Sequence, residues 1–262
     1  MANDIFVSDY YTRHEMHLNA IVQAAREVYN ADSQASVRIL DLATGPNEFN
    51  PFMIQRLSSA SLDYELVLSD ISPVHLEAGY ENIKEEVTSE ELSKVKCVLA
   101  DSRDLRRPLL SVPMWGKGEG DIEEVLKTFD FLASGYEKGR RVENFEDESF
   151  DLVIGCVPYS SINTGSYGNA IDESVRVLRK GGYHIVVETE VIQINEGVER
   201  DSDALARAKI RYVEDIAKKL DGLLVPVTIL STKYDLRGGD RNPEQTLQDG
   251  DVIRDSVIIH RK

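Results

Sequence analysis

Residues 37–47, with the sequence VRILDLATGPN, decide the fold of this chain. An aliphatic run containing β-branched residues leads to Asp41 and then turns sharply through Gly45. This pattern predicts a buried strand followed by a tight turn at its carboxyl end. In open α/β sheets, ligands bind in the crevice at the carboxyl ends of the strands. We therefore expect a ligand site beside Asp41.

A second acid, Asp70, stands at the end of the next apolar run. Dinucleotide-binding fingerprints differ, because they carry three glycines and place their acid on the second strand. Two acids at neighbouring strand ends suit a ligand with an ammonium group at one end and a ribose diol at the other. S-adenosylmethionine (SAM) is such a ligand, since it carries both groups.

The composition favours one domain over residues 1–262, since single domains usually stop near about 250–300 residues. The formal net charge is −16, and 42% of the residues are hydrophobic. Surfaces that track phosphates need clustered Lys and Arg, and the sequence has no such cluster. We therefore expect a small-molecule substrate rather than nucleic acid, and we leave a homodimer open.

No apolar run approaches the roughly 18 residues of a membrane span, and the N-terminus lacks the pattern of a signal peptide. We therefore expect a cytoplasmic protein. The two cysteines, Cys97 and Cys156, lie in predicted strands and have neither metal nor redox spacing. The sequence offers no cluster of metal ligands, so we expect no metal.

Alternating strand and helix patterns predict a doubly wound α/β sheet with helices on both faces. A polar, Gly-rich connection joins the last two strands and leaves no room for a crossover helix, so these strands should be antiparallel. The expected fold is a seven-stranded, mostly parallel sheet with a C-terminal antiparallel hairpin. The expected strands cover 37–42, 64–69, 95–100, 151–156, 183–188, 223–231 and 251–260; the expected helices cover 12–30, 52–60, 73–86, 167–179 and 203–220.

Five segments between residues 37 and 188 make the chain resemble the class I SAM-dependent methyltransferases. In chain order they are ILDLATG (39–45), LSDISP (68–73), VLADS (98–102), NFEDESFDLVIGC (144–156) and ESVRVLRKGG (173–182). The resemblance implies a Rossmann-like fold. It also implies transfer of a methyl group from SAM to an unidentified acceptor, with S-adenosylhomocysteine as the product.

The resemblance also implies roles for individual residues in binding SAM. Asp41, with the turn at Ala43 and Gly45, would hold the methionine end. Asp70 would accept both ribose hydroxyls, since an ionised carboxylate has two acceptor oxygens. Ile71 would pack on the face of the adenine.

Further roles follow from the third and fourth strands. Asp101 would accept the adenine amino group, and the Ser102 backbone N–H would meet a ring nitrogen. Cys156 would lie near the sulfonium and the incoming acceptor. Tyr159, in the loop after that strand, is the candidate catalytic residue, and it could equally form a wall of the site.

The N-terminal helical segment, residues 1–36, carries Tyr11 and Arg13. In many relatives this region folds over the cofactor, so these two side chains could touch its carboxylate. A solvated helix start is the alternative.

The acids have other readings that the residues alone leave open. Asp41 could cap a turn, and Asp101 could pair with Arg103. Asp70 could form an Asx-turn ahead of Ser72. Pro is favoured at the first helical position, so Ser72 before Pro73 is the better helix cap, which would leave Asp70 for a ligand.

The turn after the first strand departs from the family pattern. Ala43 replaces the usual first Gly, and Asn47 stands where another Gly is common. The pair Asn50 and Pro51 resembles a helix cap and a first helical residue, which would start the helix several residues after the turn. A helix starting that far from the ligand would weaken binding.

Residues 106–144 form an insertion between the third and fourth strands of the family pattern. A helix capped by Asp121 is expected inside it. That helix could be the family's ordinary helix, displaced, or a lid or subunit contact. Trp115 could anchor a substrate or simply pack.

Two alternatives to a methyltransferase remain at this point. The altered turn could hold SAM or S-adenosylhomocysteine in a non-catalytic binding module. The second alternative is a different class of enzyme on the same sheet, which would carry out aminopropyl transfer or nicotinamide-dependent hydride transfer. Aminopropyl transfer would need acids after the fourth strand, where residues 156–163 hold none.

Overall fold

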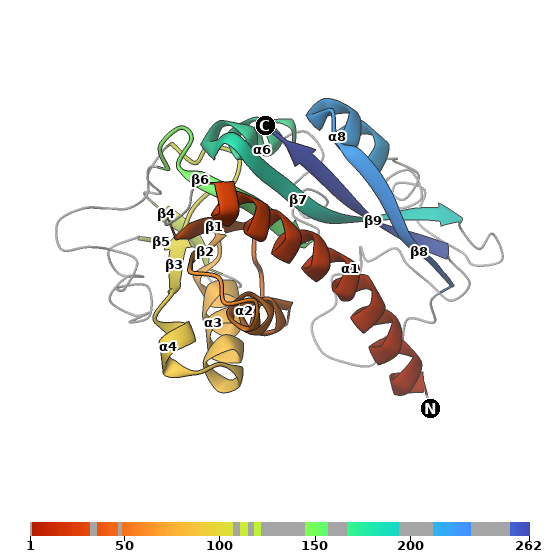
Figure 1. Cartoon of the computed structure of the whole chain (residues 1–262), viewed down its shortest axis with the longest axis horizontal. Helices are drawn as coiled ribbons and strands as arrows, with labels where there is room; N and C mark the ends of the chain where they lie inside the picture. The colour runs from red at the N-terminus through yellow and green to blue at the C-terminus, as the bar shows by residue number, and fades with distance from the viewer. Residues whose placement is uncertain are drawn as a thin grey trace.

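The computed structural model describes residues 2–31, 36–46, 49–106, 111–114, 118–121, 145–156, 167–193, 212–231 and 252–262. Its centre is a seven-stranded sheet in the order β3-β2-β1-β6-β7-β9-β8, with helices on both faces (Figure 1). From β1 the chain adds β2 and β3 on one side and then returns to add β6 and β7 on the other side, so the strand order switches between β1 and β6. In doubly wound folds, the ligand crevice lies at such a switch point.

The strands confirm the mostly parallel sheet with an antiparallel C-terminal pair. Neighbouring strands from β3 to β7 pair in parallel, whereas β9 pairs antiparallel with both β7 and β8. The strands are β1 (Val37–Leu42), β2 (Tyr64–Asp70), β3 (Val95–Leu99), β6 (Phe150–Cys156), β7 (Leu178–Gln193), β8 (Leu223–Ser231) and β9 (Val252–Arg261).

Two hydrophobic clusters cover the faces of the sheet, because alternate side chains of a strand point to opposite faces. On β1, Ile39 packs into the cluster under α1, α2 and α3, and Leu40 packs into the cluster under α6 and α8. The helices are α1 (Ala2–Ala31), α2 (Phe49–Ser59), α3 (Pro73–Glu86), α4 (Ser89–Leu92), α6 (Tyr167–Val177) and α8 (Tyr212–Leu220).

Several element boundaries differ from the sequence prediction. The first helix begins at residue 2 rather than 12. The strand β7 begins at Leu178, because the chain passes from α6 directly into the sheet. There Gly182 is required by space: a Cβ atom would lie 2.5 Å from the backbone oxygen of Asp151. The expected helix 203–220 is described only as α8, since residues 203–211 lie outside the described residues.

The prediction that Asn50 caps the second helix is wrong. The helix begins at Phe49, so Asn50 lies within its first turn. The side chain of Asn50 turns inward and donates hydrogen bonds to Asp41 and Thr44 instead of capping the helix. The helix therefore starts against Asp41 rather than away from it.

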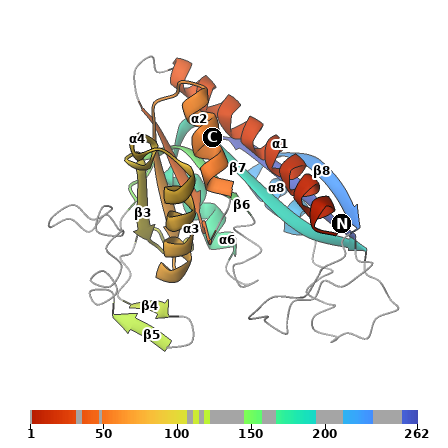
Figure 2. The same ribbon diagram turned by 90° about the horizontal axis from the view of Figure 1, so that it is seen from below.

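The insertion at residues 106–144 leaves and rejoins the fold at one place, because the backbone N–H of Phe145 donates to the carbonyl of Leu105 at 3.1 Å. Within it, β4 (Ser111–Met114) and β5 (Gly118–Asp121) form a hairpin that the sequence did not predict. Figure 2 shows this hairpin outside the main sheet. Trp115 and the helix expected after Asp121 lie outside the described residues.

Candidate cofactor-binding site

The turn after β1 is tied to the end of β2 by two hydrogen bonds that its backbone N–H groups donate. The N–H of Thr44 donates to the carbonyl of Ser69 at 2.9 Å, and the N–H of Gly45 donates to Asp70 Oδ2 at 3.0 Å. Both Ala43 and Gly45 have left-handed backbone conformations, with φ of 52° and 58°. A Cβ atom at Gly45 would meet no described atom within 4 Å, so the space beside this turn is open.

Replacing Ala43 by Gly is expected to stabilise the protein by about 0.5–1 kcal/mol. A left-handed conformation is costly for any residue with a Cβ atom, and this gain exceeds the added freedom of glycine in the unfolded chain. Urea unfolding of the wild type and the variant measures the difference. Ala78→Gly, within α3, is the matched control and should lose about 0.5–1 kcal/mol. Equal destabilisation by both changes would contradict the role of the left-handed turn.

Asp41 is a buried carboxylate whose two oxygens have different surroundings. Its side chain is 2% exposed. Oδ2 accepts a short hydrogen bond from the Thr44 hydroxyl and a second bond, of 2.9 Å, from the Asn50 amide. That amide also donates to the Thr44 hydroxyl oxygen at 2.8 Å. No side chain or backbone N–H in the described ranges donates to Oδ1 of Asp41, so among these residues Oδ1 is the oxygen that keeps its acceptor capacity.

Burial raises the pKa of Asp41 to about 6, although the hydrogen bonds from Thr44 and Asn50 act in the opposite direction. The nearby charge of Asp70 adds to the rise. Removal from water disfavours the charged form of a carboxyl group. Asp41 is therefore mostly ionised at pH 7 and becomes protonated under mildly acidic conditions.

The Asp70 carboxylate accepts two hydrogen bonds from backbone N–H groups of the protein. Its Oδ1 accepts from the backbone N–H of Ser72 at 2.8 Å, and its Oδ2 accepts from Gly45. The Asx-turn and the Ser72 cap thus occur together, since the Ser72 hydroxyl accepts from the N–H of His75. The Ser72 cap is therefore present as predicted, but it does not leave Asp70 without other hydrogen bonds. Each carboxylate oxygen has two lone pairs, so Asp70 keeps further acceptor positions.

His75 lies beside Asp70 at the start of α3. Its Nδ1 is 3.7 Å from Asp70 Oδ1, and its side chain is 39% exposed. Hydrogen bonding to Asp70 raises the pKa of His75 above its ordinary value. Nothing in the sequence pattern singled out this residue.

Asp101 pairs with Arg103 in the structure. Both carboxylate oxygens accept from the guanidinium group, and Oδ1 also accepts from the Arg103 backbone N–H. Burial acts to raise the pKa of Asp101, but Arg103 outweighs it, and the pKa is lowered overall. The contacts of Asp101 therefore match the alternative given by the sequence, in which it pairs with Arg103. Ser102 and Ile71 are half-buried at the ends of their strands.

The remaining predicted site residues are only partly described or not described. Tyr11 and Arg13 lie in α1, but their side chains are outside the described part of the structure. Cys156 is the last residue of β6, and its side chain is likewise outside. Tyr159 and Asn47 lie wholly outside the described residues. The structure therefore brings together Asp41, Ala43, Gly45 and Asp70, and adds Thr44 and Asn50 to them.

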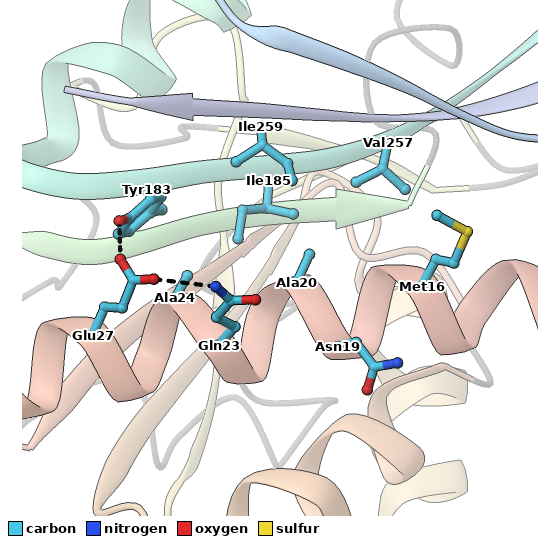
Figure 3. A pocket seen from close by; sticks show the side chains of 10 residues that line it. All are labelled: Met16, Asn19, Ala20, Gln23, Ala24, Glu27, Tyr183, Ile185, Val257 and Ile259. Atoms are coloured by element: carbon cyan, nitrogen blue, oxygen red, sulfur yellow. Dashed lines mark hydrogen bonds between the residues drawn. The ribbon is translucent and has the colours of Figure 1, made fainter.

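A cavity of about 400 Å³ lies elsewhere, between α1 and the outer part of the sheet (Figure 3). Figure 3 shows Ala20 of α1 facing Ile185, beside Val257 of β9. At one end the Tyr183 hydroxyl donates to the Glu27 carboxylate. None of the predicted cofactor residues whose side chains the structure describes lines this cavity, so it is separate from the turn between Asp41 and Asp70.

In the described ranges, no group of three or more His, Cys, Asp or Glu side chains could hold a metal ion. The described helices include none that is long and apolar enough to span a membrane. Cys97 is a buried free thiol, and burial raises its pKa to about 12.

Comparison with known proteins finds similarity only to solved structures. No family model and no curated protein matches the chain. An arsenic(III) SAM methyltransferase from Chlamydomonas reinhardtii is 13% identical, with a TM-score of 0.48; the match covers 86% of this chain and 64% of that enzyme, less than two thirds of its length. The YcgJ protein from Bacillus subtilis is 12% identical over 95% of this chain and 99% of that chain, with a TM-score of 0.49.

A SAM-dependent methyltransferase from Aquifex aeolicus is 10% identical, with a TM-score of 0.41; the match covers 90% of this chain and 88% of that one. The solved structures that resemble this chain thus include SAM-dependent methyltransferases.

Proposed function

We propose that this protein is a SAM-dependent methyltransferase acting on a small-molecule acceptor. One observation carries the proposal: two carboxylates, Asp41 and Asp70, meet at one left-handed turn at the switch point of the sheet. This arrangement suits a ligand that carries a cation and a ribose diol. A dinucleotide does not require the buried acid on the first strand.

The described side chains fit SAM in two respects. The Oδ1 atom of Asp41 can accept a hydrogen bond from the ammonium group of the methionine end. The remaining lone pairs of Asp70 can accept the ribose hydroxyls, while its bonds to Gly45 and Ser72 hold the carboxylate in place. Asp101 fits less well, because a ligand would have to displace Arg103 from it.

When bound, SAM would supply a methyl group on a sulfonium centre, open to in-line displacement by a nucleophilic acceptor. The protein's own contribution would then rest largely on proximity and orientation. Asp41 and Asp70 would fix the two ends of the cofactor. Ile71 would contact the adenine, and Ser102 would meet its polar edge. The turn at Ala43 and Gly45 would leave room for the methionine end of the cofactor.

The acceptor would bind beyond the carboxyl end of β6, where Cys156 ends the strand. Tyr159, in the following loop, is the candidate for orienting the acceptor or taking its proton. Tyr11 and Arg13 of α1 are candidates for contacting the cofactor carboxylate.

Calorimetric titration with SAM, S-adenosylhomocysteine and NAD tests the proposal. We expect the two adenosyl ligands to bind with micromolar dissociation constants and NAD not to bind. A screen of small-molecule acceptors that measures formation of S-adenosylhomocysteine then tests transfer. Binding without turnover over a broad panel would favour a non-catalytic SAM-binding module, and NAD binding alone would contradict the assignment.

A further inference from the structure

Asn50 is a fully buried polar residue in the first turn of α2. Its side-chain nitrogen donates to Asp41 Oδ2 at 2.9 Å and to Thr44 Oγ1 at 2.8 Å. Its side-chain oxygen is also buried and has no hydrogen-bond partner in the part of the chain that the structure describes.

This arrangement is unfavourable for folding alone. A buried carbonyl without a donor costs free energy, and Asn is a weak helix former. An apolar residue would avoid both costs. The reverse orientation of the amide is excluded, because it would place the carbonyl oxygen against the Asp41 carboxylate. The favourable contacts of Asn50 are therefore those that it makes with Asp41 and Thr44.

Those contacts act on one oxygen of Asp41 only. The Thr44 hydroxyl and the Asn50 amide both bind Oδ2, and the hydroxyl in turn accepts from the amide. Because a carboxylate group is planar and rigid, hydrogen bonds that hold one oxygen also fix the direction in which the other oxygen points. Charge-assisted hydrogen bonds of this kind also favour the ionised form.

We propose that Asn50 is a positioning residue: with Thr44 it holds Oδ2 of Asp41, so that Oδ1 is presented to the ammonium group of the bound cofactor. This inference rests on the proposed function, since it takes the ammonium group to be that of SAM. The helix α2 would then contribute to cofactor binding through the side chain of Asn50.

The neighbouring titratable groups set the pH range of the test. Asp70 of β2 raises the pKa of Asp41, and His75 of α3 faces Asp70. From α1, His17 stacks on Phe49, the residue before Asn50, at 4.7 Å between ring centroids. Because these groups lie close to Asp41 and Asn50, each variant has to be compared with the wild type at every pH.

The experiment measures dissociation constants of S-adenosylhomocysteine from pH 5.0 to 7.5 for the wild type, Asn50→Ala and Asn50→Asp. This ligand carries the same ammonium group and no reactive methyl group. The ¹³C carboxyl titration of Asp41 by NMR in the ligand-free protein is the second readout. Gln55→Ala is the matched control, since Gln55 is exposed on the same helix and its side-chain amide donates to the carbonyl of Glu86, away from Asp41.

We expect the loss of one charge-assisted hydrogen bond in Asn50→Ala to raise the Asp41 pKa by about one unit. The pH midpoint of binding should move up equally, so the variant should bind roughly tenfold more weakly near pH 5, about threefold more weakly near pH 6.5, and almost as tightly as the wild type at pH 7.5. Asn50→Asp, nearly the same shape, should raise the Asp41 pKa further, because it adds a like charge. Gln55→Ala should leave both readouts unchanged.

A pH-independent loss of affinity in both Asn50 variants, with no change in the Asp41 titration, would overturn the inference and leave the proposed function standing. If the wild type binds neither adenosyl ligand, the proposed function fails. The positioning role toward the cofactor then fails with it, and the Asp41 titration decides only whether Asn50 stabilises the ionised carboxylate.

Discussion

Asp70→Ala should weaken SAM binding at least about a hundredfold. Two hydrogen bonds from ribose hydroxyls to a charged group contribute about 1.5–3 kcal/mol each, and about 1.4 kcal/mol is a factor of ten. The side chain is 8% exposed, so water replaces the carboxylate poorly.

The same change also disturbs the turn. Without the carboxylate, the N–H groups of Gly45 and Ser72 lose their acceptor, so part of the effect would be structural. Asp70→Asn separates the two effects. The amide oxygen can keep one of these N–H groups bonded, while the charge that favours the diol is gone. We expect the Asn variant to fold like the wild type and still to bind SAM tens of times more weakly.

Asp63→Ala is the matched control for Asp70. Asp63 precedes the opposite end of β2, and its side chain is 62% exposed. Its only ion pair among the described residues is a 3.9 Å contact with Lys94. Calorimetry should show wild-type affinity for this variant. Unchanged affinity in a folded Asp70→Ala protein would rule out Asp70 as the ribose acceptor.

Asp41→Asn should have opposite effects on binding and on stability. Loss of the carboxylate removes the ion pair with the cofactor ammonium group, and we expect affinity to fall by about ten- to a hundredfold. Stability at pH 7 should rise by about 1–3 kcal/mol, because the variant no longer buries a charge at this position.

The size and sign of this expected change in stability follow from the pKa of Asp41. Burial raises it from 3.8 to about 6 in the folded protein. At about 1.4 kcal/mol per unit, this corresponds to about 3 kcal/mol, some of which the buried amide of Asn would offset. The folded state binds more protons than the unfolded state between these two values. The contribution of Asp41 to wild-type stability therefore falls as pH rises from about 4 to 6.

Urea unfolding of the wild type and Asp41→Asn from pH 4 to 7.5 measures this difference. The two stability curves should lie close together near pH 4 and separate as the pH rises through 6. A constant gap between the curves would contradict a titrating Asp41. An Asn variant that binds SAM like the wild type would contradict the ammonium contact.

The sequence predicts features that depend on neighbouring residues. The strand β1 covers residues 37–42 as expected, because its apolar run is short and ends in a turn. Ser72 caps α3 ahead of Pro73, since capping is a local preference. The closing antiparallel pair also follows from local features, namely two strand patterns joined without a helix.

Features that depend on distant contacts were not predictable in this way. Asn50 has the type and position of a helix cap, and only the three-dimensional contact with Asp41, nine residues earlier, gives it another role. The contacts of Asp70 with Gly45 require two strand ends to meet. Arg103 is close to Asp101 in sequence, and the residues alone could not decide between this pair and a ligand.

The backbone bond between Leu105 and Phe145 makes the insertion of residues 106–144 an exchangeable part of the protein. A segment whose two ends already touch can change its length at little thermodynamic expense, since doubling a flexible loop costs only about 0.6 kcal/mol. Its content can therefore diverge while Asp41 and Asp70 keep their geometry on strands that the exchange does not touch. In evolutionary terms, the length of this segment could change without altering the strand ends that carry the two acids. In engineering terms, Leu105 and Phe145 mark where a foreign domain could be grafted.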